Sequence, residues 1–128
     1  MSLRTALKLD AIVTGANGAA YLALAGPLED LLGLEPALLR GIGAFLLLFS
    51  GAVWAVASRP QVSSSAALAV ISINVLWAAD SIAFLAGGVA DPTTFGGIWI
   101  VMQALVVAGF AGVQAVARGA ARERALTA

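Results

Sequence analysis

The chain has 128 residues, of which 61% are hydrophobic and only 11% are charged, and its mean hydropathy is +0.98. A water-soluble domain carries about 25% charged residues, so this chain has too few charges to cover a soluble surface. The composition instead favours a protein whose solvent is the lipid bilayer. The chain has no cysteine and no histidine. Their absence excludes disulfides, thiolate catalysis, and the commonest general base and metal ligand.

Four apolar segments are long enough to cross a bilayer, whose core of about 30 Å takes about 20 residues of helix. They are residues 9–26, 37–58, 66–87 and 94–117. All four prolines lie between these segments, where helices begin or end. We therefore expect a single all-α domain over residues 1–128. Its expected fold is an integral membrane four-helix bundle with antiparallel, up-and-down topology and a basic tail over residues 118–128.

The basic residues predict the orientation of the bundle. Six of the seven Lys and Arg residues lie on the side of the two chain ends: Arg4, Lys8, Arg59, Arg118, Arg122 and Arg124. Arg40 lies on the opposite side. Because basic loops stay in the cytoplasm, both termini are predicted to be cytoplasmic, in a multi-pass protein of the cell (plasma or inner) membrane.

The N-terminal segment has an alternative interpretation. Arg4 and Lys8 precede an apolar stretch, and the Ala-Leu-Ala of residues 23–25 resembles a signal-peptidase site. Asp10 and Thr14 make a poor signal core, so an intact first span is favoured.

The segments between and after the spans predict two further helical pieces. Residues 28–34 contain four leucines and two acidic residues, which predicts a short helical turn at the membrane interface. The tail from Arg118 predicts a basic helix extension that contacts anionic headgroups.

Each predicted helix gathers its polar and aromatic residues on one face, and such faces turn inward in lipid. At about 1.5 Å per residue, Asn17, Asp80 and Gln103 lie roughly 10–14 Å below the external surface. This common depth predicts a ligand-binding site in the external half. Its candidate residues are Asp80, Arg40, Asn17, Tyr21, Trp77, Gln103, Asn74 and Trp99.

Asp80 is the only acidic residue predicted to lie well inside a span, where a bare carboxylate is costly. Two interpretations have similar weight: a structural ion pair with Arg40, and a binding site for a ligand, ion or proton. Asn17, Asn74 and Gln103 also suit interhelical hydrogen bonds. Asp10 is expected at the cytoplasmic boundary beside Lys8 or Arg118, with no mechanistic role.

Small residues recur every fourth position opposite two of the polar faces, a spacing that lets helices approach closely in lipid. The candidate subunit-interface residues are Gly15, Ala19, Ala104, Ala108 and Gly112. The alternative is an ordinary alanine-rich surface facing lipid.

No phosphate loop, nucleophile–base pair or metal-binding carboxylate cluster occurs in the sequence, so we expect no enzyme, no metal and no nucleic-acid partner. No cofactor is implied, although a lipid or quinone fits between aromatic-lined helices. In size and span number the chain is similar to the small multidrug exporters and the DoxX-like proteins. The exporters use a glutamate in the first span, where this chain has Asn17, so no residue roles are carried over.

Two functions are therefore expected. The leading hypothesis is a membrane protein, alone or as a homo-oligomer, with an outward-facing pocket at Asp80. That pocket binds or transports a small solute, a cation or a lipid headgroup. The alternative is an accessory or scaffold subunit of a larger membrane complex, with Asp80 and Arg40 as a structural pin.

Overall fold

The computed structural model describes residues 1–127, which form five helices and contain no strand. The helices are α1 (Leu3–Ala23), α2 (Ala25–Leu32), α3 (Pro36–Ala57), α4 (Ser64–Ala86) and α5 (Thr94–Thr127). The predicted all-α class is confirmed. Pro36 occupies the first turn of α3, and the Ser63 side chain caps α4 by accepting from the Ala66 amide.

Three of the helices, α3, α4 and α5, are each long and apolar enough to cross a membrane. Helices α1 and α2 meet the same standard only as a pair, and the pair is bent by 97° at its break. The break lies at Leu24, and Pro27 falls in the first turn of α2, where its missing N–H is no loss. Pro27 therefore starts a second helix instead of following the end of the first span. The helical turn expected over residues 28–34 is α2.

Large apolar side chains are widely exposed on the surface, and the mainly apolar interior contains three buried polar side chains. Leu48, Leu105 and Val116 are 77%, 68% and 75% exposed. The buried polar side chains of the described residues are Asp10, Asn74 and Gln114. Such a distribution is typical of a membrane protein, whose polar groups turn inward from lipid.

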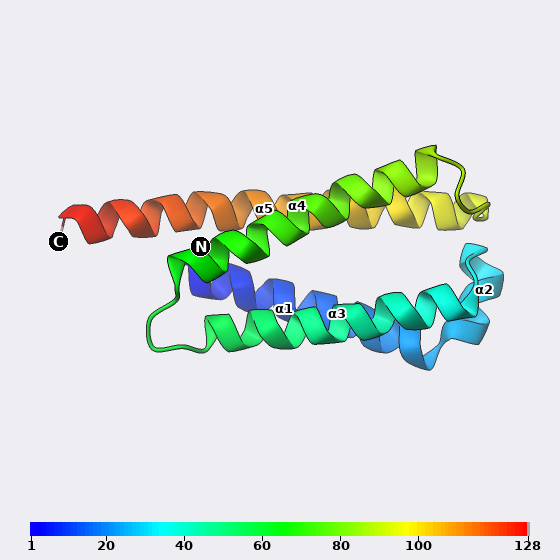
Figure 1. The fold of residues 1–128 in the computed structure, drawn as a ribbon, viewed down its shortest axis with the longest axis horizontal. Helices are drawn as coiled ribbons and strands as arrows, with labels where there is room; N and C mark the ends of the chain where they lie inside the picture. Colours follow the sequence, from blue (N-terminus) through cyan, green and yellow to red (C-terminus); the bar gives the residue numbers. More distant parts are fainter. Residues whose placement is uncertain (128) are drawn as a thin grey trace.

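The long helices form two pairs. Helix α1 packs most extensively on α3 and α4 on α5, whereas α3 and α4 barely touch. Figure 1 shows the two pairs lying along a common long axis, with the chain reversing direction from each long helix to the next. Helix α1 also contacts α5, and this contact links the two pairs.

The α1–α3 pair is close because glycine faces glycine. A Cβ added to Gly18 would lie 2.9 Å from the Gly43 carbonyl oxygen. A Cβ on Gly15 would lie 2.7 Å from Ser50 Oγ, which itself donates to the Ala11 carbonyl at 2.7 Å. The small-residue stripe of α1 therefore packs partly within the chain.

The predicted subunit interface stays a prediction, but the packing shows which of its residues are exposed. Gly15 is half-buried against α3, and Ala104 is only 3% exposed. Ala104 is therefore covered by the chain's own helices, whereas Gly15 still lines an open groove on the surface between α1 and α3. Ala19, Ala108 and Gly112 are exposed, as a subunit or lipid contact requires.

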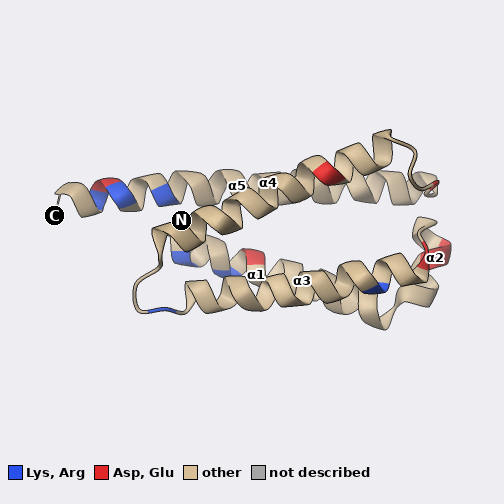
Figure 2. Cartoon of the chain, in the orientation of Figure 1, with Lys and Arg blue, Asp and Glu red and all other residues tan. Residues whose placement is uncertain are grey.

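Charges separate between the two ends of the molecule. Figure 2 shows basic residues on the N-terminal part of α1, on the α3–α4 loop and on the C-terminal part of α5, and acidic residues on α2 at the opposite end. Arg4 donates to the carbonyls of Ala57, Arg59 and Pro60 at 2.7, 2.8 and 3.1 Å, respectively. Arg118 donates to the Ser64 carbonyl at 2.9 Å. The predicted helical tail continues α5 to Thr127.

Candidate functional site

A pocket of about 230 Å³ lies between the long helices, in the half of the molecule that contains α2. We call it the outer pocket. Its apolar wall comes mainly from Leu38, Leu39 and Ile42 of α3, with Leu34, Phe84 and Ile100. Its polar and aromatic lining includes Tyr21, Trp77, Asp80, Ser81, Trp99 and Gln103. Five of the eight candidate ligand-binding residues therefore lie together here.

Hydrogen bonds hold the outer-pocket wall together. Trp99 Nε1 donates to the Tyr21 hydroxyl at 2.7 Å, which joins α5 to α1. Trp77 Nε1 donates to Gln103 Oε1 at 3.1 Å, and Gln103 Nε2 donates to Ser81 Oγ at 3.0 Å. Both indole N–H groups are thus already bonded, so the rings contribute to a ligand site mainly through their π faces and apolar surface.

Asp80 is the one charged side chain of the outer-pocket lining. It lies about six residues before the end of α4, or roughly 9 Å along the helix axis. Its side chain is exposed within the isolated chain. Within the described residues, its carboxylate has no hydrogen-bond or ion-pair partner.

Arg40 does not join this site. It is exposed on α3 and is not part of the pocket lining. No ion pair connects it to Asp80 in the part of the chain that the structure describes. The structural pin considered from the sequence is therefore not formed.

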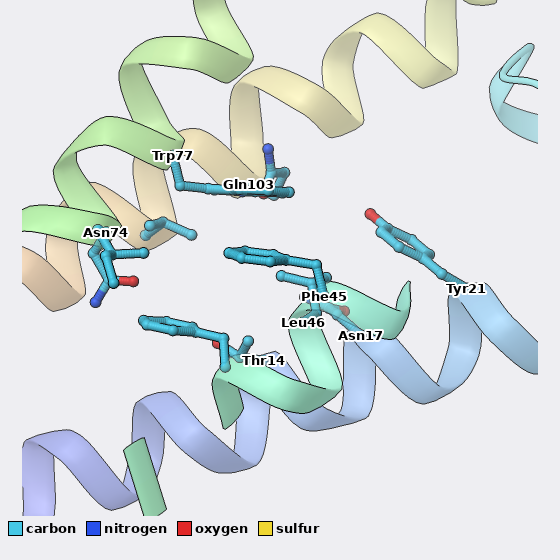
Figure 3. Close-up of a pocket in the computed structure, with 11 residues that line it drawn as sticks. Thr14, Asn17, Tyr21, Phe45, Leu46, Asn74, Trp77 and Gln103 are labelled. Carbon is cyan, nitrogen blue, oxygen red and sulfur yellow. The ribbon is translucent and has the colours of Figure 1, made fainter. Parts of the chain in front are cut away.

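A second, smaller cavity of about 30 Å³ lies deeper between the helices, and we call it the inner cavity (Figure 3). Asn17 and Asn74 line this inner cavity and not the outer pocket. Tyr21, Trp77 and Gln103 line both spaces. The two spaces are therefore neighbours that share a wall of three side chains.

Next to the inner cavity lies a buried cluster around Asp10, whose side chain is 1% exposed. Asn74 Nδ2 and Gln114 Nε2 donate to Asp10 Oδ2 at 2.7 and 2.8 Å. Thr14 Oγ1 donates to Asp10 Oδ1 at 2.9 Å. Asn74 Nδ2 also donates to Gln114 Oε1 at 3.1 Å. We call these four residues the inner cluster, and it connects α1 of one helix pair to α4 and α5 of the other.

Asp10 does not bond Lys8 or Arg118, the cations expected beside it, but is buried among neutral partners. Lys8 Nζ lies 5.2 Å from the Trp54 ring centroid, and Arg118 is bonded to the Ser64 carbonyl. Helix α1 begins at Leu3 and not near residue 9, so Asp10 lies two turns inside it. The sequence contained two indications of the inner cluster. Asp10 and Thr14 are four residues apart on one helix, and Asn74 and Gln114 lie in otherwise apolar stretches of theirs.

Comparison of the chain with protein-family models, with curated proteins and with solved structures finds no match. Its function is therefore argued from the geometry of these sites.

Proposed function

We propose that this chain is a multi-pass protein of the cell membrane that crosses the bilayer four times, with α1 and α2 together forming the first, broken span. Three spanning helices and the bent pair support this number. The basic end holds both chain termini, which favours a cytoplasmic position for them. In this orientation the outer pocket lies in the external half.

The outer pocket binds a small solute that carries an organic ammonium group. One observation carries this proposal: Asp80 is the pocket's only charged side chain, has no cationic partner among the described residues, and shares the lining with aromatic side chains. A carboxylate attracts a cation strongly at low dielectric constant. Tyr21, Trp77 and Trp99 add the ring faces on which ammonium groups are stabilised.

Transport is the use that fits this pocket best. The inner cavity continues from the outer pocket toward the basic end, through the shared residues Tyr21, Trp77 and Gln103. Four helices enclose little space, so passage of a solute requires these shared side chains to move or a second copy to complete the route.

The test uses tetramethylammonium as the probe and tert-butanol as its uncharged analogue, with the purified protein in nanodiscs. Calorimetry is expected to detect binding of the cation alone, and Asp80→Asn is expected to weaken it about tenfold or more. Arg40→Gln is the matched control, because Arg40 lies outside the pocket, and it should leave the affinity unchanged. Equal affinity of wild type and Asp80→Asn for tetramethylammonium would show that the Asp80 carboxylate does not bind the cation. Flux of the probe into proteoliposomes then tests transport separately.

An accessory subunit of a larger complex is the second candidate. The exposed small residues Ala108 and Gly112 on α5 favour it, because they allow a foreign helix to approach closely. Native mass spectrometry of the protein from its own membrane discriminates between the two. A stoichiometric protein partner supports the accessory role, and a monomer or homo-oligomer supports the transport role.

A further inference from the structure

The outer pocket is closed at the end of the molecule that carries α2. Leu34, which follows α2, lines the pocket and is 6% exposed, and Ala25 and Leu32 of α2 are each 2% exposed. These three side chains belong to one apolar cluster with the pocket residues Leu39 and Ile100. A solute that approaches from the water beyond α2 therefore meets packed apolar side chains.

Hydrogen bonds around Thr93 join α2 to α5 at the same end, and we call them the clasp. The Thr93 amide donates to the Leu32 carbonyl at 3.0 Å, and the Thr93 hydroxyl donates to the Leu31 carbonyl at 2.7 Å. The same hydroxyl accepts from the Gly96 amide at 3.0 Å. A Cβ on Gly96 would collide with the Leu32 carbonyl oxygen. The two helices thus meet backbone to backbone, which leaves no room for a solute to pass between them.

The side of the outer pocket between α3 and α4 is open. Residues of both helices line the pocket, yet α3 and α4 barely touch. Figure 1 shows α4 diverging from α3 toward the end that carries α2. The lining residues Leu38 and Ile42 of α3 and Phe84 of α4 are each half-buried, and Asp80 is exposed. We call this side the lateral opening, and in the proposed topology it faces lipid.

The depth of Asp80 decides what surrounds a ligand at the lateral opening. Asp80 lies roughly 9 Å along the axis from the end of α4, in a bilayer whose hydrocarbon core is about 30 Å thick. A solute whose ammonium group reaches this carboxylate from the side keeps its other substituents among Leu38, Ile42, Phe84 and the lipid chains. Polar substituents are costly in such surroundings, so apolar ones are favoured.

The lining also restricts the polar head of the ligand. It contains one carboxylate and no Lys or Arg. A phosphate attached to the ammonium group would have no cation in the pocket to pair with, and the Asp80 carboxylate would repel it. These charges favour a head that carries a positive charge alone.

We propose that the ligand of the outer pocket is a single-chain amphiphile with an ammonium head and an alkyl tail, and that it enters from the lipid through the lateral opening. This inference rests on the proposed ammonium site at Asp80. The head binds the carboxylate and the aromatic ring faces, and the tail leaves the pocket between α3 and α4. The ligand therefore reaches its site from the membrane and not from the external water.

The experiment measures displacement of radiolabelled tetramethylammonium from the protein in nanodiscs by decyltrimethylammonium and by decanol. Decyltrimethylammonium is expected to act at an aqueous concentration about 100-fold or more below that of unlabelled tetramethylammonium, because its tail stays in apolar surroundings while its head binds. Decanol has a tail of the same length without the charge and should displace none.

A polar substitution at the lateral opening tests the path of the tail. Ile42→Asn places an amide beside the tail, so it should weaken decyltrimethylammonium roughly tenfold and leave the affinity for tetramethylammonium nearly unchanged. Leu48→Asn is the matched control, because Leu48 is 77% exposed on the same helix and lies outside the pocket. Partition of the amphiphile into lipid is common to all variants and cancels in the comparison. Thr93→Val removes the clasp hydroxyl and should leave the association rate of decyltrimethylammonium unchanged.

Three results would overturn the lateral route. They are equal potency of the two cations, equal effects of Ile42→Asn and Leu48→Asn on decyltrimethylammonium, and faster association in Thr93→Val, which would place the entry at the clasp. A disulfide-linked dimer of Ile42→Cys in native membranes would also overturn it, because a second copy would then cover the opening. Wild type that binds no tetramethylammonium would instead refute the Asp80 site itself, so the failures of the two proposals are distinguishable.

Discussion

Gly18 of α1 and Gly43 of α3 meet backbone to backbone, and each occupies the space that a Cβ on the other would need. A Cβ on Gly43 would lie 2.8 Å from the Gly18 carbonyl oxygen, and a Cβ on Gly18 would lie 2.9 Å from that of Gly43. Backbone oxygens cannot move aside as a flexible side chain can. The distance between α1 and α3, and with it the position of Tyr21 and the inner cavity, therefore depends on these two glycines.

Gly43→Ala is predicted to destabilise the α1–α3 pair by about 1–3 kcal/mol, since the added methyl group must push the helices apart. Reversible unfolding in mixed micelles measures the change. Gly51→Ala is the matched control on the same helix, because a Cβ there meets nothing within 4 Å. Equal stability of the two variants would contradict the proposed role of the close contact.

Gln114→Leu is predicted to cost about 1–3 kcal/mol, because it removes a donor from Asp10 and leaves buried polar groups without a partner. The side chain is 0% exposed and bonds both Asp10 and Asn74. Gln61→Leu in the exposed α3–α4 loop makes the same chemical change outside the core and should cost little. The unfolding assay described for Gly43→Ala compares the free energies of unfolding of the two variants. An unchanged free energy in Gln114→Leu would show that these hydrogen bonds of the inner cluster do not stabilise the fold.

The proposed topology predicts which loops an impermeant maleimide reaches from outside intact cells. The chain has no native cysteine, so single cysteines report without background. Val89→Cys, at a position that is 74% exposed in the α4–α5 connection, should react at once. Gln61→Cys, in the α3–α4 loop, should react only after the membrane is permeabilised. The reverse pattern would place the termini outside.

Hydropathy and proline positions were enough to predict the apolar helices, because length and composition decide whether a helix can cross a bilayer. The structure places α3, α4 and α5 close to the predicted bounds. The break at Leu24 was not predictable in the same way. The bounds 9–26 placed Pro27 after the end of the first span, although a proline in a first turn is equally suited to starting a helix.

The candidate site was predictable only in its external half. Counting depth along the helices placed Asn17, Asp80 and Gln103 at one level, and the outer pocket contains Asp80 and Gln103 but not Asn17, which lines the inner cavity. The burial of Asp10 was not predicted, because its partners Asn74 and Gln114 come from helices far along the chain. The sequence also could not decide whether Asp80 pairs with Arg40. The charges are opposite, but the rotation of α3 leaves Arg40 outside the pocket.

The division of the chain into two helix pairs has a consequence for biogenesis. Asp10 belongs to the first pair, and its amide partners Asn74 and Gln114 belong to the second. During synthesis α1 emerges long before α4 and α5, so its carboxylate meets the translocon and the lipid with only Thr14 to bond it. The hydrogen bonds to Asp10 are complete only when α4 and α5 bring Asn74 and Gln114 to α1.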